Sequence, residues 1–142
     1  MENNLKFNSA ICTSREQSER LLELGLKKET ADCALLPLTD KITSVLIKPS
    51  IKDIKDTIPA WSLGRLLEML PSPIPIGEKL PTFHHYAYLD LSKVSAHYYW
   101  EDYDGAEKAL ASFYGNGFFA VIVDATEWLI KEGNFPKEYL EE

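Results

Sequence analysis

Leucines recur at helical spacing near the middle of the chain and predict a short amphipathic helix over about residues 62–70. They occupy positions i, i+3, i+4 and i+7 of one helical stripe, namely Leu63, Leu66, Leu67 and Leu70. Ser62 is placed to cap the first turn, and Pro71 ends the helix. Trp61 precedes the cap, where it can fold back onto Leu66 as a hydrophobic staple. The stripe and Trp61 indicate either a core face, which is the commoner use of such a pattern, or a partner-binding face.

A second amphipathic segment predicts a helix over about residues 14–24. Thr13 and Glu16 have the spacing of a capping box, in which each side chain bonds the backbone of the other residue. Gly25 suits the left-handed conformation that ends many helices, and Leu26 falls where a Schellman motif makes its apolar contact. The preceding residues 1–12 lack periodicity and indicate a flexible or edge-pairing lead.

The segments around the leucine helix carry weaker signals. Residues 28–34 indicate another short helix, and the β-branched and apolar residues of 41–47 favour a strand that Pro49 closes. Residues 48–58 alternate lysine and aspartate with isoleucine and indicate a loop or a turn of helix. The proline-rich residues 71–81 predict a surface connection without a continuous hydrogen-bonded element.

Aromatic residues predict a β-hairpin in the second half of the chain. Its strands are expected at residues 86–91 and 96–102, joined by a short loop at 92–95. Asp104 is placed to cap a helix over about residues 105–114, which the glycines at 115 and 117 would end.

The last long apolar segment fits either a strand or a helix at its start. Residues 118–123 alone are typical of a buried strand, but the pattern continues without a break to Gly133. One helical face then carries five apolar residues, Phe118, Val121, Ala125, Trp128 and Leu129. Because about fifteen residues exceed the common strand length, a helix over about residues 118–132 is favoured.

Together these elements predict an α+β fold in a single domain over residues 1–142, with three main helices packed on a small antiparallel sheet. A chain of 142 residues can bury one core without a disulfide or metal staple. Apolar residues make up 45% of the chain and charged residues 26%, which is typical of globular proteins and argues against disorder.

Charge and cysteine content narrow the function classes. The formal net charge of −7 disfavours direct nucleic-acid binding, because phosphates would be repelled, but it is compatible with a basic protein partner. Cys12 and Cys33 are too few for a disulfide framework, and no secretory segment is evident, so reduced thiols and a cytoplasmic location are expected. The longest apolar run, 118–123, is far shorter than the roughly 20 residues of a membrane helix, so no membrane association is expected.

The residues capable of chemistry form no recognisable catalytic, cofactor or metal signature. The histidines and cysteines lack the closely spaced pairs of a structural zinc site: His84, His85, His97, Cys12 and Cys33. Neighbouring strand residues point to opposite faces, which separates the two adjacent histidines, while the sequence leaves open whether the five side chains converge. No Gly-x-Ser-x-Gly elbow is present, and the glycines at 115 and 117 lack the remainder of a phosphate-binding loop. Catalytic residues stay unassigned, and no cofactor or metal is expected.

An acidic, aromatic run is the candidate interaction surface. Its members are Tyr98, Tyr99, Trp100, Glu101, Asp102 and Asp104. Tyrosine and tryptophan are enriched at interface hot spots, and the carboxylates could meet a basic partner. The alternative is a half-buried strand whose rings pack on the helices and whose carboxylates are ordinary solvated groups at a turn.

Several segments carry a resemblance to a wider group of proteins. They are Glu16-Gln17-Ser18, residues 21–26, 30–32 and 59–63, Leu66-Leu67 and the late Trp128-Leu129. In this order they resemble small uncharacterised proteins of Bacteroidetes genomes, phages and mobile elements. The shared motifs are helix caps and core residues, so the resemblance implies no activity, cofactor or catalytic residue. The sequence thus predicts a non-catalytic protein-interaction or accessory protein of unknown partner and oligomeric state. The alternative is a small enzyme with an unrecognised active site.

Overall fold

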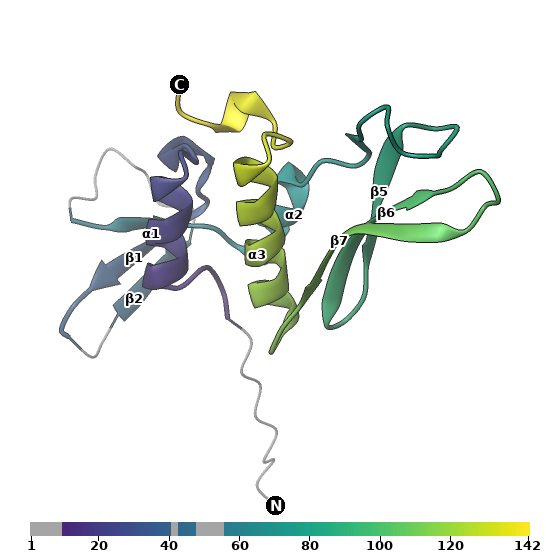
Figure 1. The fold of residues 1–142 in the computed structure, drawn as a ribbon. Helices are drawn as coiled ribbons and strands as arrows, with labels where there is room; N and C mark the ends of the chain where they lie inside the picture. The colour runs from purple at the N-terminus through teal and green to yellow at the C-terminus, as the bar shows by residue number, and fades with distance from the viewer. Residues whose placement is uncertain (1–9, 41–42, 48–55) are drawn as a thin grey trace, which may run out of the picture.

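The computed structural model describes residues 10–40, 43–47 and 56–142. Within them, helices and two antiparallel sheets form an α+β structure (Figure 1), which confirms the predicted fold class. The helices are α1 (Arg15–Glu23), α2 (Leu63–Met69) and α3 (Phe118–Lys131). The strands are β1 (Cys33–Pro37), β2 (Thr43–Ile47), β3 (Ile58–Ala60), β4 (Ile74–Pro75), β5 (Tyr86–Leu91), β6 (Ser95–Glu101) and β7 (Glu107–Tyr114). The prediction of one small sheet is wrong, because one sheet has the order β2-β1-β3 and the other β4-β5-β6-β7.

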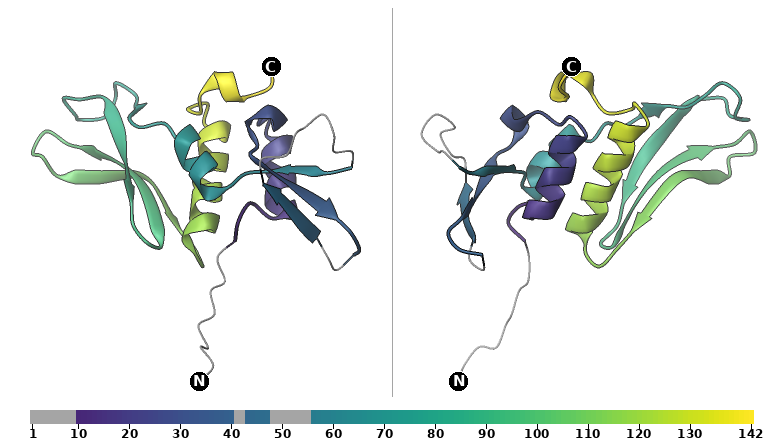
Figure 2. Two further views of the ribbon diagram at one scale, coloured as in Figure 1. Left: turned by 180° about the vertical axis from the view of Figure 1, so that it is seen from behind. Right: turned by 60° about the vertical axis from the view of Figure 1, so that its left-hand side comes forward.

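The elements stack in layers with α3 near the centre (Figures 1 and 2). The three-stranded sheet lies beside α1, and the four-stranded sheet lies on the other side of α3. Helix α2 packs against α3, which also contacts β6 and β7. An ion pair of 2.9 Å between Arg20 Nε and Glu127 Oε1 links α1 to α3. The main apolar cluster draws buried residues from all three helices and from the four-stranded sheet.

Helix α1 begins one residue later than the predicted capping box requires. Ser14, rather than Thr13, is the N-cap: its hydroxyl accepts from the Gln17 N–H at 3.2 Å, and Gln17 Oε1 accepts from the Ser14 N–H at 2.9 Å. Thr13 is fully buried, and its hydroxyl bonds Ser18 Oγ at 2.7 Å. Thr13–Glu16 and Ser14–Gln17 both have the capping-box spacing. Because the Thr13 hydroxyl is buried in the core, it does not cap the helix, and the Thr13–Glu16 assignment is wrong.

The end of α1 matches its prediction and is tied to the C-terminal segment. Gly25 has a φ of 98°, and the N–H groups of Gly25 and Leu26 donate to the carbonyls of Leu22 and Leu21, which is a Schellman motif. Leu26 then forms a β-bridge with Leu140. The C-terminal segment, which includes a 3-10 turn at Lys137–Tyr139, therefore packs beside the loop after α1.

The three-stranded sheet corrects two boundaries. The short helix expected over 28–34 is a 3-10 turn at Lys28–Thr30, whereas Cys33 and Ala34 belong to β1. Ile58, expected in a loop, begins β3, which pairs with β1. The backbone of β1 pairs with a strand on each side, and this pairing determines that these residues adopt strand conformation. Local sequence patterns do not encode that pairing. Strand β2 lies within the predicted 41–47, while residues 1–9, 41–42 and 48–55 of the predicted lead, strand and loop lie outside the described residues.

The four-stranded sheet includes the predicted hairpin and two strands that the sequence did not indicate. Strands β5 and β6 fall at the expected positions. The proline-rich segment is more than a surface connection, because Ile74 pairs with Ala87 as part of β4 and is 1% exposed.

The helix predicted over 105–114 is wrong, since residues 107–114 form β7 and pair along the length of β6. A tight turn replaces the expected cap: the Asp102 carboxylate accepts from the N–H groups of Asp104 and Ala106, both at 2.9 Å. Gly105 supports this turn with a φ of 79°. Asp104 therefore caps no helix, and cross-strand pairing overrides the helix-forming composition of the segment.

The leucine helix and the C-terminal helix are confirmed as α2 and α3. Ser62 caps α2 by accepting from the Arg65 N–H at 3.1 Å. In α3 the first three residues are half-buried, and the next three, Val121, Ile122 and Val123, are fully buried. That all-round burial explains why residues 118–123 also resembled a buried strand.

Trp61 connects the segments that meet at the start of α2. Its side chain is 0% exposed and belongs to the main apolar cluster together with Leu66. The indole N–H donates to Thr30 Oγ1 at 2.8 Å. Its backbone N–H donates to Thr13 Oγ1 at 3.1 Å, and its carbonyl accepts from the Thr13 N–H at 2.9 Å. Of the two uses left open by the sequence, Trp61 therefore serves the core.

We expect Trp61→Ala to lower the free energy of unfolding by about 3–5 kcal/mol, because it removes a buried aromatic side chain and leaves a cavity. Urea denaturation followed by circular dichroism measures this change. The matched control is Leu38→Ala, since Leu38 is 60% exposed; it should change stability by less than about 0.5 kcal/mol. Equal denaturation midpoints for the two variants would contradict burial of the indole.

The capping assignment makes a separate prediction about α1. Ser14→Ala should lower the free energy of unfolding by about 0.5–2 kcal/mol, because the Gln17 N–H loses its acceptor. Glu16→Ala is the comparison, since the Glu16 side chain takes no part in the observed box but would supply the acceptor of a Thr13–Glu16 box. Thermal denaturation of both variants distinguishes the two capping boxes, and a larger loss from Glu16→Ala would favour the Thr13–Glu16 box.

Candidate functional site

The predicted interaction run divides between the two faces of strand β6. Tyr98 is 0% exposed and Trp100 is 8% exposed, so neither side chain is available as a contact surface. The Tyr98 hydroxyl donates to the Pro71 carbonyl at 2.7 Å, and its ring lies 5.8 Å from that of Trp128 on α3. Burial raises the pKa of Tyr98 well above its ordinary value. Tyr98 therefore holds the sheet against α3, and Trp100 is buried on the same face of β6.

The other members of the run remain accessible to solvent to different degrees. Tyr99 is half-buried, on the face of β6 opposite Tyr98, and Glu101 is exposed two residues further along. Asp102 is committed to the hairpin turn, and its Oδ2 also lies 4.0 Å from Lys108 Nζ. Asp104 is exposed in that turn. Of the six residues, Tyr99 and Glu101 thus contribute side chains to the uncovered face of the sheet.

Two tyrosines of β5 extend this uncovered face. Tyr88 lies directly opposite Tyr99, with 6.2 Å between the ring centroids. Tyr86 precedes Tyr88 by two residues and shares its face, and the two are 47% and 41% exposed. With His84, these three tyrosines and Glu101 line a pocket of about 260 Å³. We refer to Tyr86, Tyr88, Tyr99 and Glu101 as the tyrosine face.

Three carboxylates and one lysine lie at the tyrosine face. Glu101 lies directly opposite Glu107 of β7, an arrangement of like charges that destabilises a strand pair. Within the described residues neither glutamate has an ion-pair partner. A second, smaller pocket of about 210 Å³ lies beside Tyr99, and its lining includes Lys108 as well as Asp90 and Glu107. This part of the surface is therefore suited to a positively charged group.

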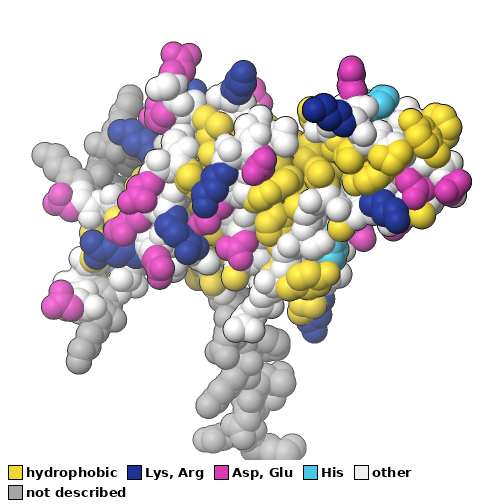
Figure 3. Space-filling model, viewed as in Figure 1, with side chains coloured by type: hydrophobic (Ala, Val, Ile, Leu, Met, Phe, Trp, Pro, Cys, Tyr) yellow, Lys and Arg dark blue, Asp and Glu magenta, His cyan; other side chains and the backbone are white. Residues whose placement is uncertain are grey.

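Figure 3 shows the side-chain types on one side of the molecule. Hydrophobic side chains, with tyrosine counted among them, gather over the region of the four-stranded sheet, where acidic, basic and histidine side chains lie beside them. The part of the molecule around α1 carries mainly charged side chains of both signs. On this side of the molecule, the exposed apolar and aromatic side chains are thus concentrated over the four-stranded sheet.

The histidines do not converge on the cysteines. His84 lines the tyrosine pocket, whereas His97 bonds Ser112 Oγ at 2.9 Å and contacts the ring of Tyr114. His85 is exposed before β5, with a φ of 56°. In the described part of the chain, no group of three or more histidine, cysteine or acidic side chains is arranged to hold a metal ion.

Cys12 and Cys33 do meet, in the small cluster of the three-stranded sheet. Both thiols are buried and interact with each other. Burial raises the pKa of Cys12, and burial followed by the nearby Asp32 carboxylate raises that of Cys33 to about 12. Asp32 itself accepts from the Ser62 N–H at 2.8 Å and from the Ser62 hydroxyl. A raised pKa disfavours the thiolate, so the arrangement suits packing better than nucleophilic catalysis.

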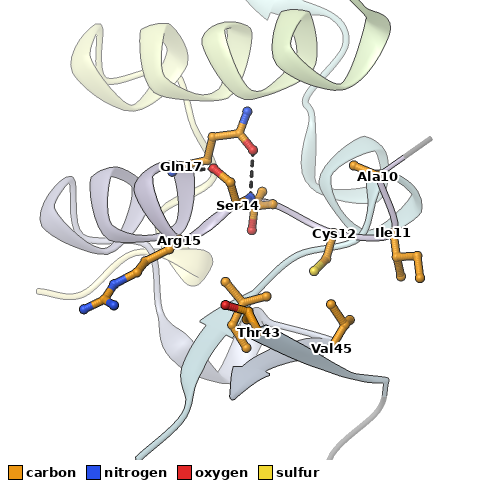
Figure 4. Close-up of a pocket in the computed structure, with 10 residues that line it drawn as sticks. Ala10, Ile11, Cys12, Ser14, Arg15, Gln17, Thr43 and Val45 are labelled. Atoms are coloured by element: carbon orange, nitrogen blue, oxygen red, sulfur yellow. Dashed lines mark hydrogen bonds between the residues drawn. The ribbon is translucent and has the colours of Figure 1, made fainter. Parts of the chain in front are cut away.

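A larger pocket of about 510 Å³ lies where the segment before α1 meets β1 and β2 (Figure 4). Its lining includes Ile11, Cys12 and Val45, and it is mostly apolar. Figure 4 shows the reciprocal bonds of Ser14 and Gln17 at its edge, while Arg15 extends away toward Glu19, with 3.0 Å between Nε and Oε1. The one thiol on its wall has a raised pKa, so the pocket supports no catalytic assignment.

Comparisons with known proteins assign no role to these residues. No protein-family model, no curated protein and no solved structure matches this chain. Among the described residues, no helix has the length and apolar character needed to cross a membrane.

Sequence reasoning placed Tyr86 and Tyr88 in the hairpin but did not include them in the interaction surface. The signal that could have found them is the two-residue period of a strand. Applied to β6, it separates Tyr99 and Glu101 from Tyr98 and Trp100. Applied to β5, it places Tyr86 and Tyr88 on one face. The pairing register then brings Tyr88 opposite Tyr99.

We expect Cys33 to resist alkylation in the folded protein. At pH 8 a rise in pKa from 9.0 to about 12 lowers the thiolate fraction by on the order of a thousandfold, and burial limits access further. Iodoacetamide labelling with mass spectrometry, in native buffer and in urea, measures the rates at each cysteine. Native labelling of Cys33 as fast as labelling in urea would contradict this environment.

Proposed function

We propose that this protein is a non-catalytic interaction protein, built as a single α+β domain, whose tyrosine face binds a basic segment of a partner protein. The observation that carries the proposal is the uncovered face of the four-stranded sheet. Helix α3 contacts β6 and β7 from the side on which Tyr98 is buried, whereas Tyr86 and Tyr88 on the opposite side stay 47% and 41% exposed.

The chemistry of this face favours a protein partner. Tyrosine presents a large, rigid contact area with few rotatable bonds, and it is enriched at interface hot spots. Three tyrosines from adjacent strands sit together here, although burial in a core would contribute more to stability than partial exposure does. A surface of this composition is typical of a recognition site.

Charge favours a basic segment over other protein partners. Glu101, Glu107 and Asp90 contribute three carboxylates around Tyr99 against one lysine, Lys108, and the two glutamates lie directly opposite each other. A bound lysine or arginine would relieve their repulsion, and the net charge of −7 would steer a basic partner toward the protein. The resemblance to proteins of Bacteroidetes genomes and mobile elements, and the expected cytoplasmic location, stay predictions within this proposal.

The proposal predicts selective, salt-sensitive binding of basic peptides to the full chain. An array of synthetic peptides of equal length and graded net charge supplies the probes, and fluorescence anisotropy measures affinity at low and high salt. Basic peptides should bind and acidic peptides should not. The double variant Tyr86→Ala with Tyr99→Ala should weaken binding at least about tenfold, since hot-spot residues each contribute about tenfold or more.

Controls separate the tyrosine face from the rest of the surface. Leu38→Ala removes an exposed apolar side chain elsewhere, and Glu23→Gln removes an exposed carboxylate of α1. Both should bind like the wild type, and all variants are compared only after circular dichroism shows equal folding. Trp100→Ala is unsuitable, because that side chain is buried. Equal binding of basic and acidic peptides, or undiminished binding by the folded double variant, would overturn the proposal.

A further inference from the structure

The pocket within the tyrosine face combines aromatic rings with an uncompensated carboxylate. Three tyrosines, Glu101 and His84 line about 260 Å³. We propose that this pocket binds an alkylated ammonium group, carried by a methylated lysine side chain of the partner. The identity of the carrier rests on the proposed function, whereas recognition of the ammonium group rests on the pocket alone.

The ring arrangement is the first observation that supports an ammonium ligand. Aromatic faces attract cations within about 6 Å of the ring centroid, and clusters of such rings recognise quaternary ammonium groups. Tyr88 and Tyr99 have their centroids 6.2 Å apart and their planes inclined at 40°. A cation seated against this pair can lie within reach of both rings, and Tyr86 supplies a third.

Ring inclination also distinguishes between the two common organic cations. A guanidinium is planar and recognises a ring by stacking parallel to it. Two rings inclined at 40° cannot both lie parallel to one plane. A methylated ammonium is nearly spherical and makes the same contact with rings of any orientation, so the geometry favours ammonium over guanidinium.

The carboxylates supply the second observation. Glu101 lines the pocket, and Glu107 lies opposite it on β7. The nearest lysine of that hairpin, Lys108, has its Nζ 4.0 Å from Asp102 rather than paired with either glutamate. Glu101 therefore brings to the pocket a negative charge that forms no ion pair with a described side chain, and a bound ammonium would pair with it.

Pocket size limits the ligand to a small group. Pockets that enclose drug-sized molecules measure about 300–1,000 Å³, and this one is smaller, at about 260 Å³. The end of one methylated lysine side chain is of suitable dimensions, and the rest of the peptide would lie along the sheet surface outside the pocket.

Matched ligands test the role of the positive charge. Choline and its neutral carbon isostere, 3,3-dimethylbutan-1-ol, have nearly the same shape and differ in charge. Nuclear magnetic resonance titration of the full chain should show choline shifting signals of Tyr88 and Tyr99, with the isostere binding at least about tenfold more weakly. Equal affinities for the two would overturn the inference, because they would show a merely apolar pocket.

Matched variants test the role of the rings. Tyr99→Phe keeps the aromatic face and should retain choline binding, whereas Tyr99→Leu keeps apolar bulk but should weaken binding by about 2- to 30-fold. Glu101→Gln should weaken binding as well. Tyr114→Ala is the control, since Tyr114 is exposed on the same sheet outside the pocket. Unchanged affinity in the folded Tyr99→Leu variant would overturn the inference.

Binding experiments with methylated and unmethylated peptides distinguish failure of this inference from failure of the proposed function. A basic peptide containing trimethyllysine should bind more tightly than the same peptide with unmodified lysine, and choline should compete with it. If basic peptides bind to the tyrosine face but neither methylation nor choline matters, the ammonium pocket is overturned and the protein-binding function stands. If choline binds and no peptide does, the pocket stands with a free small molecule as its ligand, and the protein-binding function fails.

Discussion

Burial of Trp61 is the constraint on which the arrangement of the first half depends. The indole reaches the turn at Thr30, the backbone of Trp61 exchanges hydrogen bonds with Thr13, and the next residue, Ser62, is held by Asp32. A single residue thus aligns the entry to α1, the start of β1 and the cap of α2. The polar groups buried around it are paired, so the large apolar ring is accommodated without an unsatisfied donor.

The four-stranded sheet uses its two faces in opposite ways. Toward α3 it presents Tyr98, whose ring lies beside that of Trp128, and Trp100 is buried on the same face. Away from α3 it presents Tyr86, Tyr88 and Tyr99, which are similar in chemistry but only partly covered. Since adjacent strand residues alternate between faces, one short aromatic run contributes to both the core and the surface. Composition alone therefore does not distinguish a buried tyrosine from an exposed one in this sheet.

The parts of the fold that could be predicted from the sequence are those set by local interactions. The cap at Ser62, the end of α1 at Gly25 and the long apolar pattern of α3 depend on neighbours within a few residues, and all three are confirmed. The prediction of a Thr13–Glu16 capping box was wrong because Ser14 and Gln17 have the same spacing. Which hydroxyl is buried depends on Trp61, which lies 48 positions away from Thr13 in the chain.

The strands and the site were harder to predict because their determinants are non-local. Residues 107–114 contain good helix formers, yet pairing with β6 makes them a strand, with an irregular register between Tyr98 and Tyr99. The pairing of Cys33 with Ala60 likewise assigns Cys33 to a strand. At the site, the acidic and aromatic composition was evident, but separating Tyr99 from Tyr98 required the strand direction, and joining Tyr99 to Tyr88 required the register.

The position of α3 along the chain has a consequence for synthesis. All the strands described here precede it, so the face of β5–β7 that it covers is made before its cover exists. During translation, which proceeds at about 5–20 residues per second, the ring of Tyr98 has no helical cover until Val121 and Leu129 are made, while strand edges and aromatic rings remain available to other chains. Nascent chains of this protein therefore have a period in which premature association competes with folding, and the arrival of α3 ends it.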